Sequence, residues 1–386
     1  MFLYIKFFCS LNLRSVNILK VAQILYAGLG GHGSVVFSLL DSDKCREWQP
    51  VLGFLGIEPM SPTYIDACLT RDIPFSYFAA TSGKPWKNWP SIFSWLCASE
   101  PEVILLHSVT GLLPCWWFAH SRSVPLIAVE HQANSLKRRS DWLYSFLAML
   151  LADKVIVLTP AYNQELRARL GLFYRSTKVV LIPNGIDTFK FRPSGRPFFS
   201  GQIVRLGMAS RFTGIKRHDV LVRMMLMLRE QVPAINWQLS LAGDGESFSE
   251  ISQMVQSMGL ESCVSLPGQL NDSAMINWFN SQDIYLHASE GETLSTAILQ
   301  AMSSGLPIVA SNVPGIRDLL LGESVCGVLI ERQSPQGFAE AVIELINSTA
   351  YAEILAQSAR KLVVSTYSHT KMFTSYTQML KNINDI

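Results

Sequence analysis

Short apolar runs alternate with longer segments of helical pattern along the whole chain. The runs have the length of buried strands, and the segments between them fit helices. The predicted strands are 21–27, 51–55, 103–107, 126–130, 155–158, 179–182, 203–209, 237–242, 264–266, 284–287, 308–310 and 328–330. This alternation predicts an α/β fold whose parallel sheets are covered by helices on both faces.

The chain has 386 residues, more than one ordinary core organises, which predicts two domains. The segment 188–200, TFKFRPSGRPFFS, has the prolines, glycine and serines of a linker. We expect Rossmann-like, doubly wound domains over 17–190 and 200–366, followed by a terminal segment over 367–386. Ligands bind outside the carboxyl ends of such strands, so two facing sheets would form a cleft suited to two substrates.

Composition narrows the class of protein. The formal net charge of +2 argues against a dedicated nucleic-acid partner. The 7 cysteines include no CxxC pair, which favours reduced thiols in a cytoplasmic protein over disulfides or a zinc site. No apolar run reaches the roughly 18 residues of a membrane-spanning helix. Residues 1–16 fit either a weak membrane anchor or an incorrectly assigned start, and the sequence leaves both open.

The hexapeptide GLGGHG at 28–33 follows the first predicted strand and precedes a helix. It matches GxGxxG, in which small residues let the backbone approach a phosphate at a helix N-terminus. A dinucleotide site would also need an acidic residue at the end of the second strand, where the chain has GFLG at 53–56, and Glu58 lies further into the loop. A dehydrogenase and a tight turn without a ligand remain alternatives to a substrate contact at Gly30 and Gly31.

Two stretches of the second half also lie where predicted strands end. Arg211 and Lys216 fall between a strand and a helix, where two cations beside a helix N-terminus suit a diphosphate. Gly243 belongs to another glycine-rich strand end, LAGDGE at 241–246, which is a weaker signal because many turns look like this.

The most specific stretch runs over 289–310 and predicts a strand end, an acidic loop, a helix, a turn and a strand. Thr293, Leu294 and Ser295 would expose backbone N–H groups at the helix start, facing the cleft. The carboxylate of Glu292 beside them could accept hydrogen bonds from sugar hydroxyls. Gln300 lies two turns further along the same helix.

The order and spacing of these stretches resemble glycosyltransferase family 4, of the GT-B fold, over nearly the whole chain after residue 17. Further matches are EH at 130–131, ADKVIVLT at 152–159 and IPNGID at 182–187. The resemblance implies an acceptor-side domain followed by a nucleotide-sugar-binding domain, with a central cleft between them. It also implies that the helix from about Tyr367 crosses back to the first domain.

The family's hallmark is a pair of glutamates separated by seven residues. Aligned on the helix, the first falls on Glu292 and the second is replaced by Gln300, which can still donate and accept hydrogen bonds to ribose hydroxyls. A register starting at Glu290 would put Ile298 at the second position, which cannot bind ribose, so Glu292 is preferred.

The resemblance implies transfer of a hexosyl or N-acetylhexosaminyl unit from a nucleotide sugar to an acceptor hydroxyl, with retention of configuration and with neither cofactor nor metal. Arg211 and Lys216 would neutralise the charge that grows on the leaving diphosphate. Glu292 would position the donor sugar, and His131 would hydrogen-bond it. His107, at another strand end, is a candidate for contact with the acceptor.

A basic stretch, Lys137 to Arg139, precedes an aromatic and apolar helix, and a second aromatic stretch covers 85–95. This pattern fits peripheral contact with an anionic membrane, as a lipid-linked acceptor in surface polysaccharide or glycolipid assembly would require. An ordinary buried helix with a basic cap fits equally well.

Two further classes of protein stay open. A nucleotide-sugar epimerase would share the two-domain shape, although His131 and the Glu292–Gln300 spacing disfavour it. A non-catalytic subunit that binds nucleotide sugars is supported only by the missing second glutamate.

Overall fold

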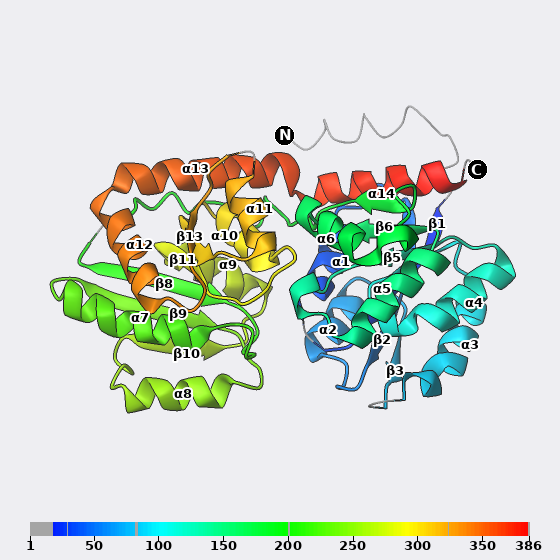
Figure 1. Ribbon diagram of the computed structural model, residues 1–386, viewed down its shortest axis with the longest axis horizontal. Coiled ribbons are helices and arrows are strands. Elements are labelled where there is room, and N and C mark those ends of the chain that lie inside the picture. The colour runs from blue at the N-terminus through cyan, green and yellow to red at the C-terminus, as the bar shows by residue number, and fades with distance from the viewer. Residues whose placement is uncertain (1–17, 29, 82–83, 200, 323, 385–386) are drawn as a thin grey trace.

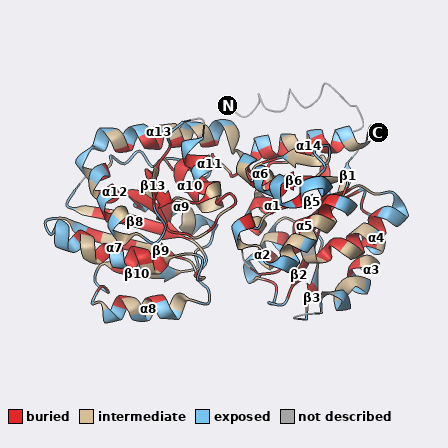
Figure 2. Cartoon of the chain, viewed as in Figure 1, coloured by how far each residue is buried: buried red, intermediate tan, exposed pale blue. Residues whose placement is uncertain are grey.

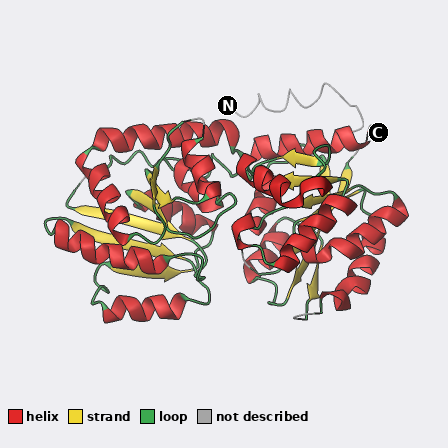
Figure 3. Ribbon diagram, in the orientation of Figure 1, coloured by secondary structure: helices red, strands yellow, loops and turns green. Residues whose placement is uncertain are grey.

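The computed structural model describes residues 18–28, 30–81, 84–199, 201–322 and 324–384, so the predicted extension over 1–16 lies outside the described residues. The chain forms two α/β halves that lie side by side (Figure 1). Strands and helices alternate through both (Figure 3).

The first half is built from strands and helices in strict succession, with short 3₁₀ turns between some of them. Its elements are β1 (Leu19–Tyr26), α1 (Gly31–Asp41), β2 (Trp48–Gly56), α2 (Pro62–Thr70), β3 (Phe75–Ala79), α3 (Trp89–Ser99), β4 (Val103–Leu106), α4 (Leu112–Arg122), β5 (Leu126–Val129), α5 (Arg139–Leu151), β6 (Lys154–Val157), α6 (Pro160–Leu170) and β7 (Val179–Leu181).

The rest of the chain repeats this pattern and ends in three consecutive helices. Its elements are β8 (Ile203–Ala209), α7 (His218–Gln231), β9 (Asn236–Ala242), α8 (Phe248–Ser257), β10 (Val264–Gly268), α9 (Asp272–Ser281), β11 (Ile284–His287), α10 (Thr296–Ser303), β12 (Ile308–Ser311), α11 (Pro314–Leu321), β13 (Val328–Ile330), α12 (Pro335–Asn347), α13 (Thr349–Thr366) and α14 (His369–Asn384).

Both sheets are doubly wound. Their strand orders are β3-β2-β1-β4-β5-β6-β7 and β10-β9-β8-β11-β12-β13, and the neighbouring strands pair in parallel. The order reverses beside β1 and beside β8, where α/β sheets open a crevice for ligands. The predicted fold class, two Rossmann-like parallel sheets, is therefore confirmed.

Every predicted strand is found, but β3 was missed. Its sequence FSYFA has only Phe78 buried, because β3 is an edge strand of its sheet. Such a strand lacks the continuous apolar run that marks strands buried on both faces. Buried residues concentrate in the other strands and on the inner faces of the helices (Figure 2).

The C-terminal helices tie the halves together. α13 runs along the second half and α14 along the first (Figure 1). The Phe373 ring on α14 packs 4.9 Å from that of Trp48, centroid to centroid. Arg360 on α13 donates to the backbone oxygens of Thr188 and Phe191 in the connection between the sheets, and to Ser303 at the end of α10.

A buried ion pair anchors the segment before α5. The Lys137 Nζ lies 2.9 Å from Glu130 Oε2, and these side chains are 2% and 3% exposed. The same nitrogen donates to Ser145 and Tyr162. Lys137 therefore cannot contact lipid, and that part of the predicted basic stretch is wrong. The sequence pattern cannot distinguish a lysine that caps a surface helix from one paired inside.

Replacing Lys137 with methionine should lower the free energy of unfolding by about 3–5 kcal/mol, because Glu130 would be left buried without its cation. Urea denaturation measures the change. Arg139→Gln, at an exposed neighbour, should stay within about 0.5 kcal/mol of the wild type. Equal stability of both variants would contradict the role assigned to this pair.

Candidate active site

The loops at the carboxyl ends of the two sheets meet between the halves. Thr293, after β11, donates its hydroxyl hydrogen to the backbone oxygen of His131, after β5, at 2.8 Å. At the start of α1, a Cβ built on Gly31 would lie 3.2 Å from the hydroxyl of Thr296 on α10. The structure thus brings the predicted site residues of both halves to one junction.

An acid–base cluster lies at this junction in the second half. Lys216 Nζ donates to Glu292 Oε1, and His287 Nε2 lies 2.7 Å from the same oxygen. Burial holds the pKa of His287 well below its ordinary value, with the charge of Lys216 as a further cause, so the neutral ring donates its Nε2–H to Glu292. Burial also lowers the pKa of Lys216 to about 7. His287 was missed, although it ends a predicted strand, the signal that singled out His131.

Arg211 lies in the same loop but is exposed, and its side chain makes no hydrogen bond to the described residues. The positive charge of Arg211 affects residues of the first half. Burial lowers the pKa of His32, and the charge of Arg211 lowers it further. Burial raises the pKa of Tyr64 to about 12, an effect that Arg211 opposes. The guanidinium of Arg211, which has no hydrogen-bond partner among the described residues, therefore lies across the junction from the glycine loop.

The glycines of the loop after β1 make room for neighbouring side chains. A Cβ at Gly28 would collide with the Glu58 carboxylate, and one at Gly33 would collide with the Tyr64 phenol. The Tyr64 oxygen lies 2.9 Å from both the backbone N and the backbone O of Gly30. The N–H of Gly30 is thus already bonded, which leaves Gly31, the first residue of α1, at the helix N-terminus.

Gly243 holds the Arg211 loop in place. Its φ of +135° favours glycine, and a Cβ there would collide with the backbone oxygen of Ser210. Next to it, the backbone N–H of Phe212 donates to the oxygen of Asp244 at 3.0 Å. The structure gives Gly243 a packing role, and its predicted contact with substrate stays a prediction.

The start of α10 has backbone N–H groups without an acceptor in the described ranges. Ser295 caps the helix by accepting from the backbone N–H of Ile298. Among the described residues, nothing accepts from the backbone N–H groups of Leu294 and Ser295. The half-buried side chain of Gln300 likewise has no hydrogen-bond partner in those ranges. Free N–H groups at a helix N-terminus favour an anion.

His131 and His107 lie in contact in the first half. His107 Nδ1 is 2.9 Å from His131 Nε2, and His107 Nε2 is 3.0 Å from Gln23 Oε1. His107 is buried, and both its ring nitrogens are bonded within the protein. The predicted contact of His107 with an acceptor is therefore wrong, because a strand-end position does not reveal which partners a ring already has.

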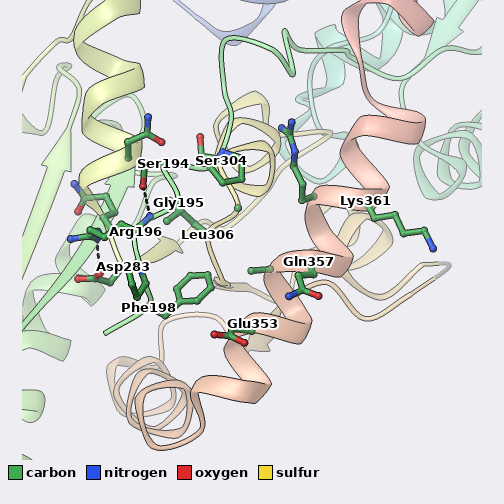
Figure 4. Close-up of a pocket in the computed structure, with 17 residues that line it drawn as sticks. Ser194, Gly195, Arg196, Phe198, Asp283, Ser304, Leu306, Glu353, Gln357 and Lys361 are labelled. Carbon is green, nitrogen blue, oxygen red and sulfur yellow. Dashed lines mark hydrogen bonds and ion pairs between the residues drawn. The ribbon is translucent and has the colours of Figure 1, made fainter. Parts of the chain in front are cut away.

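A small cavity at the junction is lined by residues of both halves, including Ser135, Glu292 and Thr293. A hollow of about 550 Å³ lies elsewhere, between the 193–198 connection and α13 (Figure 4). Asp283 and Leu306 in its wall precede β11 and β12, so it opens at the amino ends of these strands, away from the end where α/β sheets bind substrates.

Two doubly wound halves with a cationic loop and helix N-termini between them have the architecture of the GT-B fold. Residues 35–190 match the model described as Glycosyltransferase Family 4, and residues 203–348 match the one described as Glycosyl transferases group 1. The chain belongs to glycosyltransferase family 4. Matches over both halves set aside the dehydrogenase and epimerase alternatives.

Named relatives agree with this assignment. The chain is 25% identical to the UDP-Gal:alpha-D-GlcNAc-diphosphoundecaprenol alpha-1,3-galactosyltransferase of Escherichia coli, over 92% of this chain and 94% of that one. It is 24% identical to the phosphatidyl-myo-inositol mannosyltransferase of Mycobacterium leprae, over 84% and 86%. A D-inositol 3-phosphate glycosyltransferase of Arthrobacter sp. is 25% identical, but the match spans 52% of this chain and only 48% of that protein.

Solved structures share the fold. HepE of Anabaena in complex with UDP-glucose superposes with a TM-score of 0.79 at 18% identity, covering 94% of this chain and 100% of that one. Sucrose-phosphate synthase of Thermosynechococcus elongatus gives 0.78 at 16% identity, covering 95% and 99%.

The described residues contain neither a membrane-spanning helix nor a cluster of metal ligands. Within 18–28, 30–81, 84–199, 201–322 and 324–384, no helix has the length and apolar character needed to cross a bilayer. Over the same ranges, His, Cys, Asp and Glu form no group of three or more that could hold a metal ion. That catalysis needs no metal stays a prediction.

Binding of a nucleoside-diphosphate sugar should weaken as the pH rises from about 7 to about 9, approaching tenfold per pH unit. A bound diphosphate favours charged Lys216, whose pKa in the free protein is about 7, so binding must take up a proton above that pH. The diphosphate diester of such a sugar donor has no proton to lose in this range. Burial lowers the pKa values of His131, to about 3, and His218, to about 4, so these rings do not titrate there.

Calorimetry in buffers of different ionisation enthalpy measures this uptake. Lys216→Met should bind more weakly with a flat pH profile, whereas Lys87→Met, at an exposed lysine, should keep the wild-type profile. An unchanged slope in Lys216→Met would show that another group titrates.

Proposed function

We propose that this glycosyltransferase moves a sugar from a uridine diphosphate donor to a hydroxyl of a lipid-linked acceptor, with retention of configuration and without a metal ion. The relatives support the donor and the acceptor, because one is named for UDP-galactose and a diphosphoundecaprenol acceptor and another for phosphatidyl-myo-inositol. HepE was solved with UDP-glucose bound.

One observation carries the proposal: positive charge converges at the junction. The N-termini of α1 and α10 approach each other at Gly31 and Thr296, and each end carries partial positive charge. Arg211 adds a full charge that no described acidic side chain neutralises. A diphosphate between these groups would supply the missing negative charge and accept from the free N–H groups of α10.

The chain's own groups then have distinct roles. Arg211 and Lys216 offset the charge that grows on the leaving diphosphate as the bond to the sugar breaks. A diphosphate competes with Glu292 for Lys216, so binding would release the Glu292 carboxylate to accept from sugar hydroxyls. Gln300, without a partner of its own, would bond the ribose hydroxyls through its amide, and His131 would contact the sugar from the first half.

Membrane contact would involve part of the predicted surface, at α5, together with the turn after α6. Leu172 and Phe173 are 92% and 51% exposed in the turn after α6. The ring of Phe173 packs 4.9 Å from that of Phe146, which places this turn beside α5 with its exposed Leu143. We call Leu143, Leu172 and Phe173 the apolar patch. Exposed Arg139 at the start of α5 supplies positive charge suited to anionic lipid.

Arg211→Ala should lower kcat/KM by about 100-fold or more, since it removes a charge that acts on the transition state. A thermal-shift panel of nucleotide sugars first identifies the donor, and product analysis in EDTA then measures turnover and anomeric configuration. Arg223→Ala, at an exposed arginine of α7, is the matched control and should keep full turnover. Full activity of Arg211→Ala would remove that residue from the site.

Changing both Leu172 and Phe173 to serine should reduce co-sedimentation with phosphatidylglycerol vesicles by about tenfold, because apolar area would no longer leave water on binding. Leu69→Ser, at an exposed leucine on α2, should bind as the wild type does. Equal binding of all three proteins would rule out the apolar patch as the contact.

A further inference from the structure

The geometry points to a relay in which Gln23 and His107 are positioning residues that fix the ring and the proton of His131. His131 then presents an unprotonated Nδ1 to the sugar being transferred. This inference rests on the proposed function, because it specifies how His131 meets its substrate.

The relay crosses three neighbouring strands of the first sheet. Gln23 lies on β1, His107 directly after β4 and His131 just after β5, and these strands are adjacent in the order β1-β4-β5. Gln23 Oε1 is 3.0 Å from His107 Nε2, and His107 Nδ1 is 2.9 Å from His131 Nε2. The imidazole rings of His107 and His131 meet edge to edge, with centroids 5.2 Å apart and planes inclined by 28°, as a hydrogen bond between ring nitrogens requires.

The direction of the relay follows from what each group can donate. Oε1 of Gln23 only accepts, so His107 carries its proton on Nε2. Burial holds the pKa of His107 well below its ordinary value, so the neutral ring has an acceptor at Nδ1. His131 must then donate from Nε2. Burial lowers the pKa of His131 to about 3, with nearby His32 as a further cause, so its Nδ1 has no proton.

The amide of Gln23 therefore sets the tautomer of His131. If that amide faced His107 with its nitrogen instead, each proton along the relay would move to the opposite ring nitrogen. Measuring which ring nitrogen of His131 carries the proton therefore shows in which direction the hydrogen bonds of the relay run.

The backbone of His131 is held by the other half of the molecule. Its carbonyl oxygen accepts from Thr293, the residue after Glu292. The relay fixes the ring while this contact fixes the main chain, so His131 has a set position relative to the carboxylate that would hold the donor sugar. An acceptor nitrogen suits a sugar hydroxyl, and a neutral ring adds no positive charge to the junction.

His107 acts through His131 and lies in the first half, whereas the cations for the diphosphate lie in the second. His107→Phe should therefore lower kcat for the best nucleotide sugar by about tenfold while leaving the Kd for UDP unchanged. His107→Asn, whose amide oxygen can take the place of Nδ1 as acceptor, should recover most of this loss. A simple packing defect would not lower kcat while leaving the Kd for UDP unchanged, and it would not be corrected by asparagine.

Nitrogen NMR of the full chain with ¹⁵N-labelled histidine tests the relay without any substrate. The wild type should show His131 protonated on Nε2 and not on Nδ1, and His107→Phe or Gln23→Met should produce a mixture of tautomers. His131→Gln assigns the signals. His120→Phe, at an exposed ring on α4, should change neither the tautomer nor kcat. Two substitution sites keep the test decisive if one variant fails to fold.

The outcomes separate the relay from the proposed function. A proton on Nδ1 of His131 in the wild type, or an unchanged tautomer in both His107→Phe and Gln23→Met, would overturn the relay. An unchanged kcat in His107→Phe would overturn its positioning role. A wild-type chain that binds no UDP would instead overturn the proposed function, while the tautomer measurement would still decide the relay.

Discussion

The contact between Lys216 and Glu292 is the interaction on which the site depends. The junction gathers two helix N-termini, the exposed Arg211 and the buried Lys216, and burying a positive charge beside others is costly. The structure reduces this cost in two ways. Glu292 neutralises Lys216, and burial keeps His131, His218 and His287 uncharged. An anion that enters need only replace a carboxylate already held there.

Close approach of backbone makes this arrangement possible, and glycine permits it. A Cβ at Gly315 would collide with the backbone oxygens of Glu292 and Thr293, and one at Gly291 would come within 2.9 Å of Leu136 in the other half. The acidic loop that carries Glu292 therefore packs against α11 on one side and against the first half on the other. Its position is set by packing before any ligand contributes.

Much of this could be predicted from the sequence, because the relevant signals are local. Buried parallel strands appear as apolar runs, and the loops that follow them carry Arg211, Lys216 and Glu292. The features that could not be predicted depend on contacts that the local pattern does not reveal. Lys137 forms an ion pair with Glu130 in the core, and the Tyr64 hydroxyl on α2 accepts from the backbone N–H of Gly30. Gln23 was overlooked because a polar residue within a strand gives no sign of a histidine partner 84 residues away.

The helix α10 connects the chemistry to the connection between the halves. Its first turn offers the free N–H groups, and at its last residue the Ser303 hydroxyl donates to the oxygen of Phe191 at 2.6 Å. Arg360 bonds both of these residues and also Thr188. Packed cores transmit displacement because they have few voids to absorb it. A shift of α10 on binding a diphosphate would therefore reach the chain that joins the two sheets, and would couple occupancy of the proposed donor site to the relative position of the halves.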